Sequence, residues 1–189
     1  MKAKVIFHGY RGVHNLNTAT RLGSITFSDS YDIAKHYALS PNKVADLVLN
    51  PCVHHARIYL DNPCFNKDDA FIEVREIFKI GGKQLLKYAL NKYADEFRKT
   101  DYWDTEIKAY YQNDYSPWDV FERDIVGALP MPMQAYVLFD DENVIKHLRS
   151  LGYDGAIYNG SGVGHSSQEC RVFDESKIVI YKYEVLNVN

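Results

Sequence analysis

Apolar residues recur along this chain with two different periods, and together the periods predict a mixed α and β protein. Strand-forming residues alternate or run continuously in five short stretches, at residues 4–8, 23–28, 53–60, 153–158 and 177–183. Val172 and Phe173 predict one more strand, and Glu169 lies at its entrance. The polar residues 174–176 predict the turn of a final hairpin. Gly9 is expected to end the first strand, with residues 8–12 forming a glycine-containing turn.

Helical spacing predicts a helix over 31–39, which places Ile33, Ala34 and Tyr37 on one face. Further helical patterns are predicted at 42–49, 68–98, 102–115, 118–129 and 142–151. Gly81 and Gly82 are expected to break the longest of them. We interpret residues from about 66 to 135 as a helical insertion packed on one flank of the sheet. The predicted fold class is therefore α+β, with residues 1–189 forming a single domain.

Length and composition narrow the class of protein. A chain of 189 residues that is 46% hydrophobic can bury a substantial core, which excludes a disordered chain. A net charge of -3 provides no overall attraction to nucleic acid. The short apolar run at 5–7 does not predict a signal peptide, and no stretch reaches membrane-spanning length. Three scattered cysteines with no metal-ligand spacing indicate free thiols, a cytoplasmic protein and no metal site.

Glu169 follows a loop rich in Gly and Ser, at residues 160–167, and stands at the entrance of a strand. A carboxylate at the rim of a sheet beside such a loop is accessible to a substrate. The simpler alternative is that Glu169 only solvates the end of the strand. The same alternatives hold for His8 and Tyr37, either of which can be a core residue, and for Arg11, which can be an ordinary surface charge.

Four motifs occur in a defined order along the chain. They are Phe7-His8-Gly9, then Ile25-Thr26-Phe27-Ser28-Asp29-Ser30 with Ala34 and Tyr37, then Leu148-Arg149-Ser150-Leu151-Gly152-Tyr153-Asp154-Gly155-Ala156, and finally Gln168-Glu169-Cys170-Arg171-Val172-Phe173. In this order, the chain resembles the ADP-ribosyltransferase family, in the branch named for its His, Tyr and Glu (the diphtheria-toxin and poly-ADP-ribose-polymerase type). The resemblance covers about the first 65 and the last 50 residues and leaves the helical insertion unmatched.

The resemblance implies a split β-sheet core and a mono-ADP-ribosyltransferase that cleaves NAD, its co-substrate, at the nicotinamide–ribose bond. Glu169 would then stabilise an oxocarbenium-like transition state by hydrogen-bonding a ribose hydroxyl. His8 would hold the adenosine ribose, the backbone of Gly9 would pair with the nicotinamide amide, and Tyr37 would stack on the nicotinamide ring. Ser28 and Phe27 would belong to the same pocket. Arg11 is placed to contact the pyrophosphate.

The sequence also departs from this family. Many relatives carry an aromatic residue at the position of Thr26, and Gln168 with the 10–12 and 27–30 stretches faintly resembles the branch named for Arg, Ser and Glu. In that branch an acidic residue or Gln often stands two positions before the glutamate, where this chain has Ser167. We therefore favour the His-Tyr-Glu branch.

Three functions stay open at this point. The first is transfer of ADP-ribose to a macromolecule, expected to be a protein, by a phage or bacterial effector such as an anti-CRISPR protein. The second is a partner-binding module of the same fold with NAD turnover lost, and the third is NAD hydrolysis or RNA 2′-phosphate transfer. The insertion is the expected partner-recognition element. Its aromatic residues could be interface anchors or could only pack the insertion: Trp103, Tyr110, Tyr111, Tyr115 and Trp118.

Overall fold

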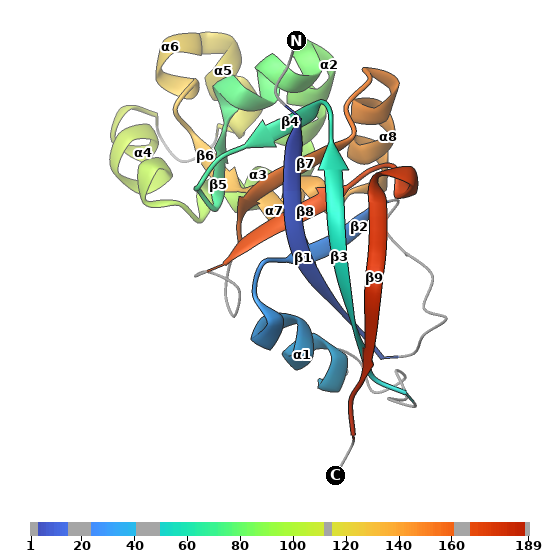
Figure 1. Cartoon of the computed structure of the whole chain (residues 1–189). Coiled ribbons are helices and arrows are strands. Elements are labelled where there is room, and N and C mark those ends of the chain that lie inside the picture. Colours follow the sequence, from blue (N-terminus) through green and yellow to red (C-terminus); the bar gives the residue numbers. More distant parts are fainter. Residues whose placement is uncertain (1–3, 15–23, 41–49, 112–114, 161–166, 188–189) are drawn as a thin grey trace. The chain divides into compact units, whose positions relative to one another are not determined.

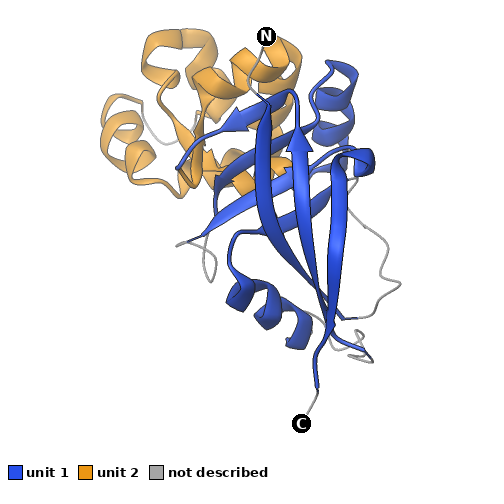
Figure 2. Cartoon of the chain, in the orientation of Figure 1, with its two compact units in different colours: residues 1–68, 140–189 blue, residues 69–139 orange. Residues whose placement is uncertain are grey.

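The computed structural model describes residues 4–14, 24–40, 50–111, 115–160 and 167–187. The chain forms two compact units, coloured separately in Figure 2. Unit 1 contains Met1–Asp68 and Asp140–Asn189, and unit 2 contains Asp69–Phe139. The helical insertion predicted at about 66–135 corresponds closely to unit 2.

Unit 1 is built on a seven-stranded sheet with the order β4-β7-β8-β2-β1-β3-β9. The strands are β1 Val5–Val13, β2 Ile25–Ser28, β3 Cys52–Leu60, β4 Pro63–Asn66, β7 Gly155–Asn159, β8 Gln168–Val172 and β9 Ile178–Val185. Only β4 and β7 pair in parallel, and the other five neighbouring pairs are antiparallel. The sheet is therefore mixed, and the predicted α+β class is confirmed.

The sheet consists of two halves that meet at a single registered pair of residues. β1 pairs with β3 over its whole length, and β2 pairs with β8 over all four of its residues. Between the two halves, the described residues of β1 and β2 are paired only at Tyr10 and Ser28. Figure 1 shows the consequence, since β1, β3 and β9 run together while β2, β7 and β8 cross them obliquely.

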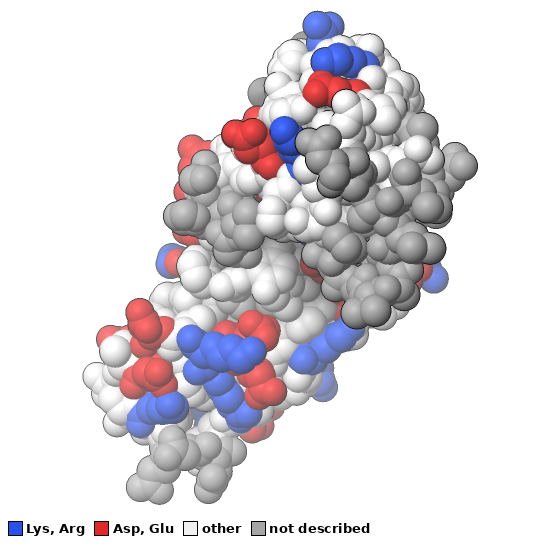
Figure 3. Space-filling model, turned by 90° about the horizontal axis from the view of Figure 1, so that it is seen from below, with Lys and Arg blue, Asp and Glu red and all other residues white. Residues whose placement is uncertain are grey.

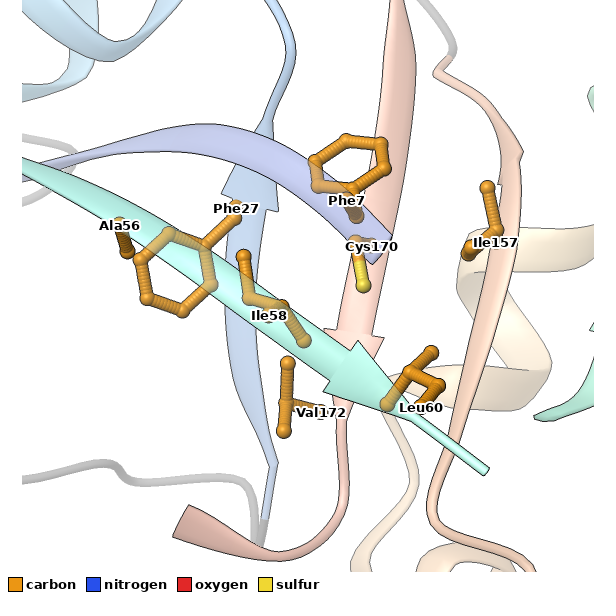
Figure 4. Packing of buried hydrophobic residues seen from close by; sticks show 8 residues of the cluster. All are labelled: Phe7, Phe27, Ala56, Ile58, Leu60, Ile157, Cys170 and Val172. Carbon is orange, nitrogen blue, oxygen red and sulfur yellow. The ribbon is translucent and has the colours of Figure 1, made fainter. Parts of the chain in front are cut away.

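One face of the sheet forms a hydrophobic core. Figure 4 shows its side chains converging from five strands, and they are Phe7, Phe27, Ala56, Ile58, Leu60, Ile157, Cys170 and Val172. We call this the apolar face and the opposite side the polar face. Because side chains alternate along each strand, His8 and Tyr10 lie on the polar face, next to the buried Phe7.

Helix α1, Tyr31–Leu39, lies on the polar face at the end of β1. Ser30 caps its N-terminus by accepting a hydrogen bond from the backbone nitrogen of Ile33 at 3.4 Å. A Cβ added to Gly12 would lie 1.8 Å from the backbone oxygen of Ala34, so only glycine lets α1 come this close to β1. The helix predicted at 31–39 is confirmed.

The motif at 152–155 has a structural role. The Asp154 carboxylate accepts hydrogen bonds from the backbone nitrogens of Asp61 (2.6 Å) and Asn62 (3.0 Å), and so fixes the turn between β3 and β4. A Cβ on Gly155 would lie 2.6 Å from the backbone oxygen of Arg171. The preceding helix, α8 (Glu142–Ser150), is capped by Asp141 and confirms the helix predicted there.

Unit 2 is mostly helical and includes a two-stranded antiparallel sheet, β5 with β6. Its elements are β5 Phe71–Glu73, α2 Val74–Lys92, α3 Ala94–Arg98, a π-helical turn Trp103–Ile107, α4 Lys108–Tyr110, α5 Pro117–Arg123, α6 Ile125–Ala128, β6 Pro132–Gln134 and α7 Ala135–Phe139. The break predicted at Gly81 and Gly82 is present as a kink, because Gly82 adopts a φ of 68° inside α2. The helix predicted from residue 68 begins later, because residues 71–73 form β5.

Two predictions about unit 1 are wrong. The first strand does not end at Gly9, because β1 continues to Val13 and the two glycines serve close packing inside a strand. The final hairpin does not exist either. β8 lies between β7 and β2, whereas β9 crosses to the far edge and pairs with β3. The short turn between them, Glu175–Lys177, is a 3-10 turn that begins this crossover. The helix predicted at 42–49 lies outside the described residues.

Candidate functional site

A row of five side chains crosses the polar face, one from each of five neighbouring strands. From β3 to β7 they are His55, Tyr10, Ser28, Glu169 and Tyr158, and each is directly paired with the next. We call this the polar row. It passes through the Tyr10–Ser28 pair at which the two halves of the sheet meet, so the split of the sheet lies beside Glu169.

Glu169 lies in a network of charged and phenolic groups. Its side chain is 13% exposed, and its Oε2 is 3.9 Å from the Nη2 of Arg171. Arg171 is itself buried, donates from Nε to the Tyr158 hydroxyl at 2.9 Å and forms an ion pair with Asp140. The Tyr158 hydroxyl in turn hydrogen-bonds Glu169. Glu169 is therefore held from two sides while one part of it still reaches solvent.

The surroundings of Glu169 disfavour the ionised form of its carboxyl group. Burial is the main cause that raises its pKa above the ordinary value, and the charge of Asp140 adds to the rise. Arg171 and the hydrogen bond from Tyr158 act in the opposite direction but do not cancel it. Burial also raises the pKa of Asp140, which Arg171 again opposes. A partly buried carboxyl with a raised pKa beside a second acid is typical of sites that carry chemistry.

Tyr37 stands on α1, and the structure brings it close to Glu169. Its side chain is 40% exposed, so it is not the core tyrosine of the simpler alternative. Burial raises the pKa of its phenol, and the charge of Glu169 is the next largest cause. The phenol therefore lies within the field of the Glu169 carboxylate, although the two residues are far apart in the sequence.

His8 is exposed on the polar face, two residues before Tyr10, and pairs across the ladder with Arg57. It lies on the same face as Glu169, in a part of β1 that is not paired with the described residues of β2, roughly 10 Å or more away by strand spacing. Gly9 follows it with its α-hydrogens on the apolar face, where a Cβ would lie 2.8 Å from the ring of Phe7. Close packing accounts for this glycine.

The structure divides the other predicted site residues between the two faces of the sheet. Ser28 belongs to the polar row, and its buried hydroxyl donates to Ser167 Oγ at 3.2 Å and accepts from the backbone of Ser30. Phe27 is 1% exposed in the core of the apolar face, so it cannot line a pocket on the polar face. Arg11 also points to the apolar side, paired with His54, because β1 alternates regularly through residues 9–12. Its expected contact with a pyrophosphate is therefore inconsistent with a site at Glu169.

Sequence reasoning missed four residues of this face. Arg171 follows Glu169 by two positions in β8, so strand alternation already indicates a shared face. Tyr158 lay in a predicted strand, but only the strand order brings it beside Glu169. Arg57 becomes visible only through its pairing with His8. No pattern in the sequence indicates Asp140 as a site residue. It follows α7 in the chain, and only its ion pair with Arg171 connects it to Glu169.

The other described residues provide no candidate for a metal site or a membrane-spanning helix. Basic and acidic side chains lie interspersed on the face shown in Figure 3. No described group of three or more His, Cys, Asp and Glu side chains is placed to hold a metal ion. Within the described ranges, no helix has both the length and the apolar character needed to cross a membrane. All three cysteines are free, and Cys52 and Cys170 are buried.

No family model matches the sequence, and neither a curated protein nor a solved structure shows a significant match. The geometry of the polar face is therefore the basis of the proposed function.

Proposed function

We propose that this protein is a mono-ADP-ribosyltransferase that cleaves NAD at the nicotinamide–ribose bond and transfers ADP-ribose to a macromolecule. One observation carries the proposal. Glu169, Tyr37 and His8, which the resemblance names as site residues, come from three separate elements and share one face of the sheet, beside the split between its halves. His8 and Tyr37 are both exposed on that face, so a ligand can reach their side chains.

The chemistry requires a carboxylate beside the bond that breaks. As nicotinamide leaves with the bonding electron pair, positive charge develops on the ribose, and an ionised Glu169 stabilises it. Tyr158 hydrogen-bonds this carboxylate and Arg171 lies 3.9 Å from it, so its position is restricted before the substrate binds. The phenol of Tyr37 is the aromatic surface for the nicotinamide ring.

In this proposal Arg57, and not Arg11, contacts the pyrophosphate of NAD. It is exposed on the polar face and directly paired with His8, and its guanidinium lies 5.5 Å from the ring centre of Tyr181. It forms no ion pair with the other described residues, so its charge is available to an anion. If His8 holds the adenosine ribose, its neighbour Arg57 is placed for the pyrophosphate.

A second candidate is a partner-binding module of the same fold. Thr26 favours it, because this residue pairs with Arg171 where many ADP-ribosyltransferases carry an aromatic residue, so one side of the nicotinamide site is open. In this alternative, the only role of Glu169 is to pair with the buried Arg171. The two candidates differ in whether NAD is consumed.

The test uses the full chain, NAD labelled on the adenylate part, and a bacterial lysate as the source of acceptors. Wild type is compared with Glu169→Gln, which removes the charge and keeps the shape, and with Glu142→Gln, an exposed glutamate outside the site. Label on a macromolecule with wild type and Glu142→Gln, but not with Glu169→Gln, is the expected result.

Two other outcomes decide between the alternatives. Free ADP-ribose without labelled macromolecule would replace transfer by NAD hydrolysis. Unconsumed NAD in all three samples, with a partner retained from the lysate, would support the binding module instead. That the acceptor belongs to a phage host or a bacterial defence system stays a prediction from the resemblance.

A further inference from the structure

Unit 2 contains a small pocket of its own, formed by the π-helical turn Trp103–Ile107, α4 and α6. Its volume is about 190 Å³. Three tyrosines and two acids dominate its lining, and they are Tyr102, Tyr110, Tyr111, Glu106 and Asp124. A volume of this size is below the roughly 300–1,000 Å³ of drug-sized ligand sites, so a group as small as one side chain is the appropriate occupant.

The walls of the pocket are fixed by hydrogen bonds. The Tyr102 hydroxyl donates to the backbone oxygen of Gly127 at 2.9 Å, and the Tyr111 hydroxyl donates to Asp124 Oδ2 at 3.3 Å. Asp124 Oδ1 accepts from the backbone nitrogen of Gly127 at 2.9 Å. Two of the three rings are therefore held in place. π-Helical turns such as Trp103–Ile107 are rare and frequently mark functional sites.

The pocket carries negative charge without a matching cation in its lining. Residues 101–124 contain seven acidic and two basic residues, Lys108 and Arg123. Lys108 pairs with Asp104, and Arg123 stacks over the ring of Tyr115 at 4.5 Å. Glu106 is exposed and forms no ion pair or hydrogen bond with the described residues. Burial raises the pKa of Tyr102, the charges of Glu106 and Asp124 add to the rise, and Arg75, which lies outside the lining, opposes it.

We propose that this pocket binds the guanidinium group of an arginine side chain on a partner protein. Aromatic faces attract cations, and a guanidinium can stack on a tyrosine while its N–H groups reach carboxylates. Unit 2 already uses the same contact internally, with Arg123 over Tyr115 and Arg98 over Trp103 at 5.8 Å. The inference concerns a site separate from Glu169 and does not depend on the proposed NAD chemistry.

The test titrates the full chain with Nα-acetyl-arginine methylamide and, as a matched neutral probe, with the corresponding citrulline derivative. Binding is followed by NMR shifts of backbone amides. The arginine probe is expected to bind at least fivefold more tightly, with shifts at residues 102–111 and 124–127. Glu106→Gln and Tyr110→Ala should each weaken it about fivefold, because one removes charge and the other an aromatic face.

These variants leave the fold intact, because Glu106 is exposed and Tyr110 is 81% exposed. Asp124 is not replaced, since it caps α6. Glu122→Gln, an exposed acid of the same unit outside the pocket, is the control and should bind like wild type. Equal binding of the citrulline and arginine probes would overturn the proposal, as would unchanged arginine binding in both pocket variants. Equal binding of a lysine derivative would overturn the preference for guanidinium.

Discussion

Two glutamates on the polar face of one sheet have pKa values that are shifted in opposite directions. Glu184 in β9 accepts hydrogen bonds from the Lys182 ammonium (2.8 Å) and the Tyr31 hydroxyl (2.6 Å), and its carboxylate lies 3.1 Å from Nε2 of His55. These contacts, with Lys182 first, lower the pKa of Glu184 to about 2. Glu169 in β8 is more buried and stands near a second acid, so its pKa is raised.

The difference separates a carboxylate whose charge is fully matched from one whose charge is not, and only the second suits the chemistry that we propose. The charge of Glu184 is matched by donors on β9, α1 and β3, and it fastens these three elements together. The charge of Glu169 is only partly compensated, and in the proposed reaction this charge would stabilise positive charge that develops on the ribose of NAD. The same residue type on the same face thus has two different environments, which shift the pKa in opposite directions.

The largest contrast is expected in NAD consumption. Glu169→Gln should reduce turnover at least about 100-fold, a loss of roughly 3 kcal/mol in transition-state stabilisation. Glu184→Gln should stay within a few-fold of wild type, because its contacts hold α1 but do not touch the reacting bond. Nicotinamide release, measured by chromatography at saturating NAD, checks both. A similar loss in the two variants would remove the distinction between the glutamates.

The acid beside Glu169 is expected to matter for stability. Asp140→Asn removes the closer of the two carboxylates that pair with the buried Arg171, leaving only Glu169 at 3.9 Å, and should lower the free energy of unfolding by about 1–2 kcal/mol. The value lies below that of a fully buried pair because the Asp140 side chain is 36% exposed. The control is Asp95→Asn, which removes an exposed partner of Arg98 and should change stability by less than about 0.5 kcal/mol. Urea denaturation measures both, and equal effects would contradict the buried network.

Two arginines test which part of the polar face meets the pyrophosphate. Arg57→Gln should weaken NAD binding about tenfold, because it removes a charged donor next to His8. Arg11→Gln should leave NAD affinity unchanged, because Arg11 points to the other face. Equilibrium binding of NAD to the Glu169→Gln background measures affinity without turnover. The reverse order of effects would restore the role that the sequence suggested for Arg11.

The smallest expected effects concern pH and stability. A carboxyl with a lowered pKa stabilises the fold above its ordinary pKa, so the contribution of Glu184 should be lost as the pH falls from 4.5 to about 2. Glu184→Gln should therefore melt below wild type at pH 7 and match it near pH 2. The raised pKa of Glu169 has the opposite sign, because stability is lost as the pH rises above 4.5. Glu169→Gln should match wild type in acid and melt at the same or a higher temperature at pH 7.

Thermal melts of the three proteins across this pH range provide the check. A Glu169→Gln protein that melts well below wild type at pH 7 would show that Glu169 is mainly a partner of Arg171. The activity contrast would then need another explanation.

Local sequence features determined much of this protein. The spacing of apolar residues predicted α1, α8 and β3, because each element has a period and end signals that its own residues supply. It also placed Glu169 at the entrance of a strand and Tyr37 on the helix after β2. These are short-range properties, set by backbone preferences and by caps such as Ser30 and Asp141.

Only the tertiary structure decided which residues meet. A turn signal at Glu175 cannot specify whether the next strand pairs with β8 or crosses to β3, because strand partners are chosen by burial over the whole sheet. The two glycines of β1 resembled a turn, yet they serve close packing against Phe7 and α1, and this error misplaced Arg11. The link from Asp140 through Arg171 to Tyr158 and Glu169 likewise exists only in three dimensions. Chain order carries no information about a charge pair that long-range packing creates.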